Sequence, residues 1–117
     1  MKKIFIMMAL GSAALVLSNC GSSKKVAAAE VPKLTYSGNL QMVIAEKCAP
    51  CHIPSKGGNK RPYDNFANVK SDIDEIIRRV ELNPTDRGFM PFKKPAKLSD
   101  STINLFKQWR TDGLLEK

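Results

Sequence analysis

The sequence predicts a small all-α domain, and three observations favour this class. Apolar residues recur at helical spacing in three segments, residues 39–48, 72–82 and 100–112. No segment shows the two-residue alternation that is typical of a half-buried strand. The chain has 117 residues, 43% of them hydrophobic. These values suit one small domain and exclude a multidomain enzyme, wholesale disorder and a polytopic membrane protein.

The N-terminal 19 residues have the features of an export signal. Lys2 and Lys3 precede an apolar stretch over residues 4–17, which is shorter than the roughly 20 residues of a membrane-spanning helix. The stretch ends in Leu-Ser-Asn-Cys, which resembles the lipobox of bacterial lipoproteins, although Asn19 departs from the usual Gly or Ala. The resemblance implies that Cys20 is the acylated first residue of the mature chain. A plain signal peptide, cleaved near residues 13–14 or 27–29, is the alternative.

Residues 20–33 are rich in small and charged side chains and have no apolar period. We therefore expect a lipid-anchored flexible tether before a domain that covers residues 34–117. Such a protein is held at a membrane of the cell envelope and faces the periplasm or the exterior, an oxidising compartment. The formal net charge is +8, but nucleic acid is not an expected partner in that location.

The first two helices are predicted from apolar residues at helical spacing. The helix over residues 39–48 places four residues on one face: Leu40, Val43, Ile44 and Cys48. The helix over residues 72–82 has a stripe of Ile73, Ile76, Ile77 and Val80. Ser71 gives this second helix a start that resembles a capping box, and Asn83-Pro84 ends it.

The helix over residues 100–112 has the clearest boundaries. Ser99 is placed to cap its N-terminus, and Asp100 in the first turn complements the helix dipole. Gly113 followed by Leu114 predicts a Schellman ending with its hydrophobic contact. The inner face is expected to carry Ile103, Phe106 and Trp109 or Arg110.

Two long stretches rich in Gly and Pro separate the helices, over residues 53–70 and 83–98. Irregular stretches of this length in a small domain usually carry function or surround a ligand. Three short helices also bury little apolar surface by themselves. We therefore expect the domain to need a covalent staple or a large internal ligand.

The most informative motif is Cys48-Ala49-Pro50-Cys51-His52. Cys-x-x-Cys-His is the attachment motif of c-type haem. The two thiols add to the two vinyl groups of one haem, and the adjacent histidine supplies an axial ligand to the iron. His52 is the single histidine of the chain. The motif therefore predicts one covalently attached haem c, held by Cys48 and Cys51, with iron bound by His52.

The motif has three other possible interpretations. A thiol–disulfide oxidoreductase would place Cys-x-x-Cys at a helix start after a strand, whereas here the motif follows a predicted helix. A zinc site would need a fourth ligand, which only carboxylates are left to supply. A structural disulfide between Cys48 and Cys51 gives no reason for His52.

Met90 is the expected second axial ligand. It lies in the second long stretch, in Gly88-Phe89-Met90-Pro91, where Pro91 favours an extended backbone at Met90. Gly88 lets the backbone approach a flat ring closely. Met42 precedes the motif and is expected to pack or to lie on an exposed flank. The alternatives are that Met90 fills a gap in the core, that Lys93 or Lys94 is the ligand, or that the sixth site is open.

These motifs together resemble the small single-haem class I cytochromes c of exported bacterial proteins. The resemblance covers residues 37–113 and depends on the haem motif, on Met90-Pro91, and on Leu98-Ser99-Asp100 before a last helix that carries Trp109. It implies an all-α cytochrome c fold with three main helices around the haem, the first and last packed together, and His52 and Met90 as the axial pair. No motif between Pro62 and Pro84 matches the family clearly.

Supporting roles follow from the same reasoning. The second ring nitrogen of His52 needs a partner, and the carbonyl of Pro62 is the candidate. Trp109 is expected to pack between the terminal helices. The candidates for contact with the haem propionates, each of which could equally be a solvated surface residue, are Lys60, Arg61, Tyr63, Arg78 and Arg79.

The resemblance implies an electron carrier and not an enzyme. One electron at a time would pass between periplasmic or membrane-bound redox proteins, whose docking faces are expected to be acidic. No small-molecule substrate is expected, because both axial positions of the iron would be filled. The alternatives are a subunit of an exported enzyme complex, a haem sensor or weak peroxidase with a labile sixth site, and, more distantly, a thiol–disulfide oxidoreductase.

Overall fold

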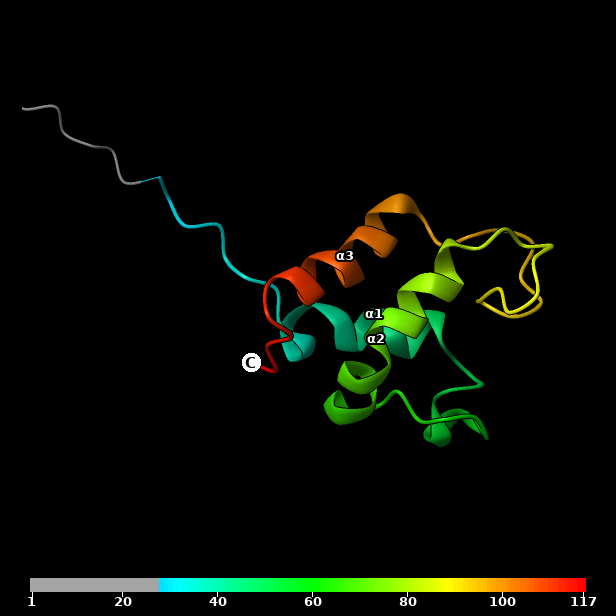
Figure 1. The fold of residues 1–117 in the computed structure, drawn as a ribbon. Helices are drawn as coiled ribbons and strands as arrows, with labels where there is room; N and C mark the ends of the chain where they lie inside the picture. Colours follow the sequence, from blue (N-terminus) through cyan, green and yellow to red (C-terminus); the bar gives the residue numbers. More distant parts are fainter. Residues whose placement is uncertain (1–27) are drawn as a thin grey trace, which may run out of the picture. The chain divides into compact units, whose positions relative to one another are not determined.

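The computed structural model describes residues 28–117, and its compact unit spans Val31–Lys117. The helices of this part (Figure 1) are η1 (Tyr36–Leu40), α1 (Gln41–Lys47), η2 (Pro54–Lys56), α2 (Phe66–Glu81) and α3 (Asp100–Thr111). The described residues contain no strand, only one isolated bridge between Thr35 and Leu115. The all-α prediction is therefore confirmed. The predicted signal peptide, Cys20 and the tether up to residue 27 lie outside the described residues.

The first predicted helix consists of two joined pieces. η1 is a π-helix, and the side chain of its N-cap, Thr35, accepts a hydrogen bond from the Gly38 N–H at 3.1 Å. α1 continues the chain without a break. The helical segment begins three residues before the predicted start, because the wider π turn brings Tyr36 onto the same buried face as Leu40 and Ile44.

α2 begins six residues before its predicted start. Its N-cap is Asn65, whose side chain accepts a hydrogen bond from the Asn68 N–H at 3.0 Å. The interpretation of Ser71 as the cap is wrong, because an earlier asparagine cap starts a turn that already adds Val69 to the apolar stripe. The complete buried stripe is Val69, Ile73, Ile76, Ile77 and Val80.

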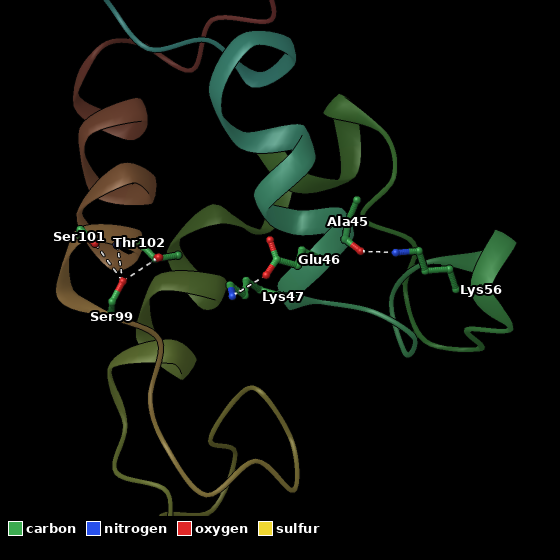
Figure 2. Close-up of polar contacts among 7 residues, drawn as sticks. All are labelled: Ala45, Glu46, Lys47, Lys56, Ser99, Ser101 and Thr102. Carbon is green, nitrogen blue, oxygen red and sulfur yellow. Dashed lines mark hydrogen bonds and ion pairs between the residues drawn. The ribbon is translucent and has the colours of Figure 1, made fainter.

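The predicted start of α3 is confirmed, and the helix ends at Thr111, one residue before the predicted end, with Asp112 as its C-cap. The Ser99 hydroxyl accepts a hydrogen bond from the Thr102 N–H at 3.2 Å, and the Ser101 and Thr102 hydroxyls lie within 2.9 Å of it (Figure 2). At the other end, the Leu114 N–H donates to the Trp109 carbonyl at 3.1 Å, and the Gly113 N–H donates to the Arg110 carbonyl at 3.3 Å. With Gly113 at a φ of 102°, these two bonds form the predicted Schellman ending.

Trp109 lies at the centre of the core. Its side chain is 0% exposed, and its ring lies 6.3 Å from Tyr36 and 6.2 Å from Phe66 between centroids. α3 contacts both α2 and η1, so the prediction that Trp109 packs between the terminal helical segments is confirmed. Truncation of a buried aromatic of this kind costs about 3–5 kcal/mol.

Hydrogen bonds join the two ends of the compact unit. We call residues 34–37 and 112–116 the terminal clip. The Tyr36 N–H donates to the Leu115 carbonyl at 2.8 Å, and the Ser37 N–H donates to the Glu116 carbonyl at 3.0 Å. The Leu34 N–H donates to the Asp112 carboxylate at 2.7 Å, and this bond lowers the pKa of Asp112. The clip closes the helical core on the side where the chain enters and leaves it.

Candidate functional site

The Cys-x-x-Cys-His motif forms the turn that ends α1. Cys48 is the C-cap residue, and its N–H donates to the Ile44 carbonyl at 2.9 Å. The His52 N–H donates in turn to the Cys48 carbonyl at 3.0 Å. Lys56, in η2, donates to the Ala45 carbonyl at 2.8 Å (Figure 2), so a cation binds the negative end of α1. The motif is thus held as one hydrogen-bonded turn.

The chain after the motif folds back along it. We call residues 53–63 the return loop. Its Lys60 N–H donates to the Cys51 carbonyl at 3.0 Å, and its Tyr63 N–H donates to the His52 carbonyl at 2.9 Å. Gly58 lies so close that a Cβ there would be 2.2 Å from the Pro50 oxygen and 2.6 Å from the Cys51 oxygen. Only glycine fits this approach, because backbone atoms cannot yield as a flexible side chain can.

The return loop also determines which nitrogen of His52 carries the proton. His52 Nδ1 lies 2.8 Å from the Arg61 carbonyl oxygen. Because a carbonyl only accepts, Nδ1 is the donor, and in the neutral imidazole Nε2 keeps its lone pair. The expectation that Pro62 supplies this carbonyl is wrong by one residue, since the Pro62 carbonyl accepts from the Asn68 side chain at 2.9 Å.

The imidazole of His52 also lies flat against the ring of Tyr63. The two ring centroids are 4.5 Å apart and the ring planes differ by 8°. The Tyr63 hydroxyl donates to Asp72 of α2 at 3.1 Å. Burial, followed by the nearby Asp72 carboxylate, raises the pKa of Tyr63 to about 12, so the phenol stays protonated as a donor. Sequence reasoning named Tyr63 only for the propionates, because a stack across the loop leaves no sequence pattern.

One cavity brings the predicted site residues together. It has a volume of about 1230 Å³ and is lined by Cys48, Cys51, His52 and Met90. Its apolar walls come from α2 and from the loop over residues 84–98, with Ile76, Val80, Phe89, Phe92 and Leu98. This volume exceeds the 300–1,000 Å³ that is typical of small-molecule pockets. The cavity is therefore a large, mainly apolar space with two thiols, one imidazole and one thioether on its walls.

Met90 is held at the cavity by its backbone and by its neighbour. The Met90 N–H donates to the Arg79 carbonyl, near the end of α2, at 3.2 Å. Phe89 is 5% exposed, and Gly88 has a φ of 95°, a conformation that favours glycine. Met42 is 83% exposed and does not line the cavity. Of the two methionines in the described residues, only Met90 is therefore placed to contribute to this site.

The two motif cysteines are not joined by a disulfide, and their surroundings differ. Cys51 is exposed, whereas Cys48 is partly covered and burial raises its pKa to about 11. Nucleophilic cysteines of redox enzymes have depressed pKa values, often at a helix N-terminus. Cys48 lies at the C-terminal end of α1, where the helix dipole disfavours a thiolate. Its environment thus suits a neutral thiol and opposes the disulfide-exchange alternative.

Basic side chains surround the cavity. Four of the five propionate candidates line it, namely Lys60, Arg61, Tyr63 and Arg79. Arg78 does not, because it is exposed on α2 and pairs with Glu75 at 2.7 Å. The loop over residues 84–98 adds three further cations that sequence reasoning did not assign to the propionates: Arg87, Lys93 and Lys94. They balance the acidic residues that share the lining, Asp72, Glu75 and Asp86.

Within residues 28–117, no group of three or more His, Cys, Asp or Glu side chains is placed to hold a metal ion. The zinc alternative needs such a group, so the described residues do not support it.

In the same part of the chain, no helix combines the length and apolar character needed to cross a membrane.

Comparison with protein-family models, with curated proteins and with solved structures gave no match.

Proposed function

We propose that this protein is an exported c-type cytochrome that carries one electron at a time between redox proteins. The observation that carries the proposal is the convergence on one cavity of both motif thiols, the His52 imidazole and the Met90 side chain. These residues are separated by a helix and two loops in the sequence. Their meeting at a space of about 1230 Å³ is what a large flat ligand would require.

The residues present fit a covalently attached haem. Cys48 and Cys51 would each form a thioether bond to it, and the Nδ1–H bond to Arg61 leaves Nε2 of His52 available as an iron ligand. Met90 would provide the second axial ligand, and the apolar walls would exclude water. A bound haem would supply an iron that gains and loses a single electron.

The chain's own residues would tune and shield this centre. His52 and Met90 would hold the iron as neutral ligands, which favour a comparatively high reduction potential. The exposed Cys51 lies on the side of the cavity that solvent reaches, so the protein would leave an edge accessible to partners. The basic residues around the cavity would steer acidic docking faces toward it, at a rate that falls with salt.

The location is part of the proposal. Export and anchoring through Cys20 would place the domain at a membrane of the cell envelope, facing the periplasm or the exterior, beside membrane-bound redox partners. The mass of the mature chain tests this directly. An acylated N-terminal Cys20, lost together with membrane association in Cys20→Ala, supports it. A mature chain that begins at residue 14 or after residue 27 without lipid contradicts it.

An optical spectrum tests the haem assignment. The chain is exported in a host with haem-attachment machinery, washed under denaturing conditions and refolded. We expect a retained haem with sharp low-spin bands in the oxidised and the reduced state. Absence of haem from a folded chain would contradict the proposal and return Cys48 and Cys51 to thiol chemistry.

Met90→Ala tests the sixth ligand, and Met42→Ala is the matched control because Met42 is exposed and away from the cavity. We expect Met90→Ala alone to lose the weak red-edge band of Met-ligated ferric haem. Unchanged low-spin bands in Met90→Ala would indicate another ligand, and Lys93 and Lys94 line the same cavity. A high-spin wild-type spectrum would instead favour a sensor or weak peroxidase with an open site.

A further inference from the structure

We propose that Tyr63 is a positioning residue that fixes the orientation of the His52 imidazole, and that Asp72 anchors it from α2. The inference rests on the proposed function, since the orientation of His52 matters most if Nε2 binds iron. It concerns a different property, however, namely which rotation of the ring the fold permits.

The contacts form a closed cycle of four residues. His52 Nδ1 donates to the Arg61 carbonyl at 2.8 Å, and Arg61 Nε pairs with Asp72 Oδ2 at 2.5 Å. The Tyr63 hydroxyl donates to that same carboxylate oxygen at 3.1 Å. The Tyr63 ring then covers the imidazole face at 4.5 Å and 8°. Each member of the cycle is therefore held by two others.

The stack and the hydrogen bond restrict different motions. The bond from Nδ1 fixes one edge of the imidazole but allows the ring to tilt about that edge. A parallel aromatic ring against one face opposes this tilt, because tilting would separate or overlap the two π faces. The backbone of both residues is also joined, since the Tyr63 N–H donates to the His52 carbonyl at 2.9 Å. Stack and hydrogen bond together leave one orientation of Nε2.

Asp72 connects this local arrangement to the core. It is on α2 between the buried residues Val69 and Ile73, so its backbone belongs to a helix that packs in the core. The Tyr63 carbonyl also accepts a hydrogen bond from the buried Tyr36 at 3.3 Å. The return loop is thus not free to carry Tyr63 away from His52, and α2 sets the position of the ring.

The test uses the haem-loaded protein and reads the ligand orientation. The electron paramagnetic resonance spectrum of the ferric state and the haem-methyl NMR shifts both depend on the plane of the axial imidazole. We expect Tyr63→Leu to change both and to shift the reduction potential. Phe66→Leu is the control, because Phe66 also packs its ring against Tyr36 and Trp109 but does not line the cavity. It should lower the Tm and leave the spectra unchanged.

A double-mutant cycle tests the anchor. Tyr63→Phe removes the hydrogen bond to Asp72 and keeps the stacked ring. Asp72→Asn weakens the same hydrogen bond and also removes the ion pair with Arg61. We expect small spectral changes in the same direction, and a double variant that equals Asp72→Asn, since Tyr63→Phe removes only a contact that Asp72→Asn has already weakened. This cycle also covers the case in which Tyr63→Leu does not fold.

The outcomes separate the two proposals. A wild-type chain that carries no haem overturns the proposed function and this inference with it. A wild-type chain with low-spin haem, combined with spectra of Tyr63→Leu that equal the wild type, overturns this inference alone. Additive effects of Tyr63→Phe and Asp72→Asn would overturn the role of Asp72.

Discussion

Replacing Gly58 by alanine tests whether the return loop packs on the motif as the structure indicates. The new Cβ would overlap two backbone carbonyl oxygens, at 2.2 Å and 2.6 Å. Overpacking of this kind costs about 1–3 kcal/mol. The Cys51 carbonyl that must move also accepts the Lys60 hydrogen bond, whose loss costs about 0.5–1.5 kcal/mol. We therefore expect a loss of about 2–4 kcal/mol in the free energy of unfolding.

Gly57→Ala is the matched control. Gly57 has a φ of 84°, and a Cβ there would meet no atom within 4 Å. The only cost is that of a left-handed backbone, about 1–2 kcal/mol for alanine. Thermal unfolding followed by circular dichroism compares the two variants. In a domain of this size 1 kcal/mol moves the Tm by roughly 4–8 °C, so Gly58→Ala should lower the Tm by at least about 8 °C.

The comparison has a clear adverse result. If Gly58→Ala unfolds at the same temperature as the wild type, or at a higher temperature than Gly57→Ala, the return loop does not press against the motif. Incomplete haem attachment in Gly58→Ala alone would be a second sign of the displaced Cys51 backbone.

Three further predictions concern other parts of the molecule. Hydrogen bonds from Arg78 and Arg79 lower the pKa of Glu75 to about 2 from 4.5. The stability that the Glu75 carboxylate adds is therefore present above pH 4.5 and is lost as the pH falls toward 2. Chemical denaturation should show Glu75→Gln to be less stable than the wild type at pH 7 but not at pH 2. In a haem-free chain that circular dichroism shows to be folded, iodoacetamide at pH 8 should alkylate Cys51 well before Cys48, because Cys51 is exposed and burial raises the pKa of Cys48 to about 11; equal rates by mass spectrometry in that folded chain would contradict the burial. Asn65→Ala removes the cap of α2 and should lower the free energy of unfolding by about 0.5–2 kcal/mol, whereas Ser71→Ala should have almost no effect.

The sequence predicted the limits of α3 to within one residue, whereas it placed the start of α2 six residues too late, for a physical reason. At each end of α3 one residue indicates the boundary without a competing candidate. Ser99 caps the start, and Gly113 takes the left-handed conformation after the end. α2 has two competing starts, Asn65 and Ser71. Both residue types cap helices, and the choice depends on whether Val69 finds a buried place. That is a tertiary effect, which local pattern does not contain.

The residues of the candidate site could be predicted from the sequence, but some of their contacts could not. The residues of the haem motif and Met90 were predicted from spacing and from the prolines and glycines around them, and the structure brings them to one cavity; their chemistry stays a prediction. The carbonyl partner of His52 was misplaced by one residue, since hydrogen-bond register in an irregular loop has no periodic signal. The stack of Tyr63 on His52 forms only when the return loop folds back on the motif, so no sequence pattern predicts it.

The terminal clip bears on how the domain would respond to mechanical load. The bridge between Thr35 and Leu115 is parallel, so pulling the two ends of the unit apart would load its bonds in shear, all at once, and not one after another as in unzipping. None of the clip residues lines the cavity. A load applied between the segment before residue 34 and the C-terminal residues would therefore be borne by the clip, while the turn that holds His52 and the loop that holds Met90 stay outside the path of the force.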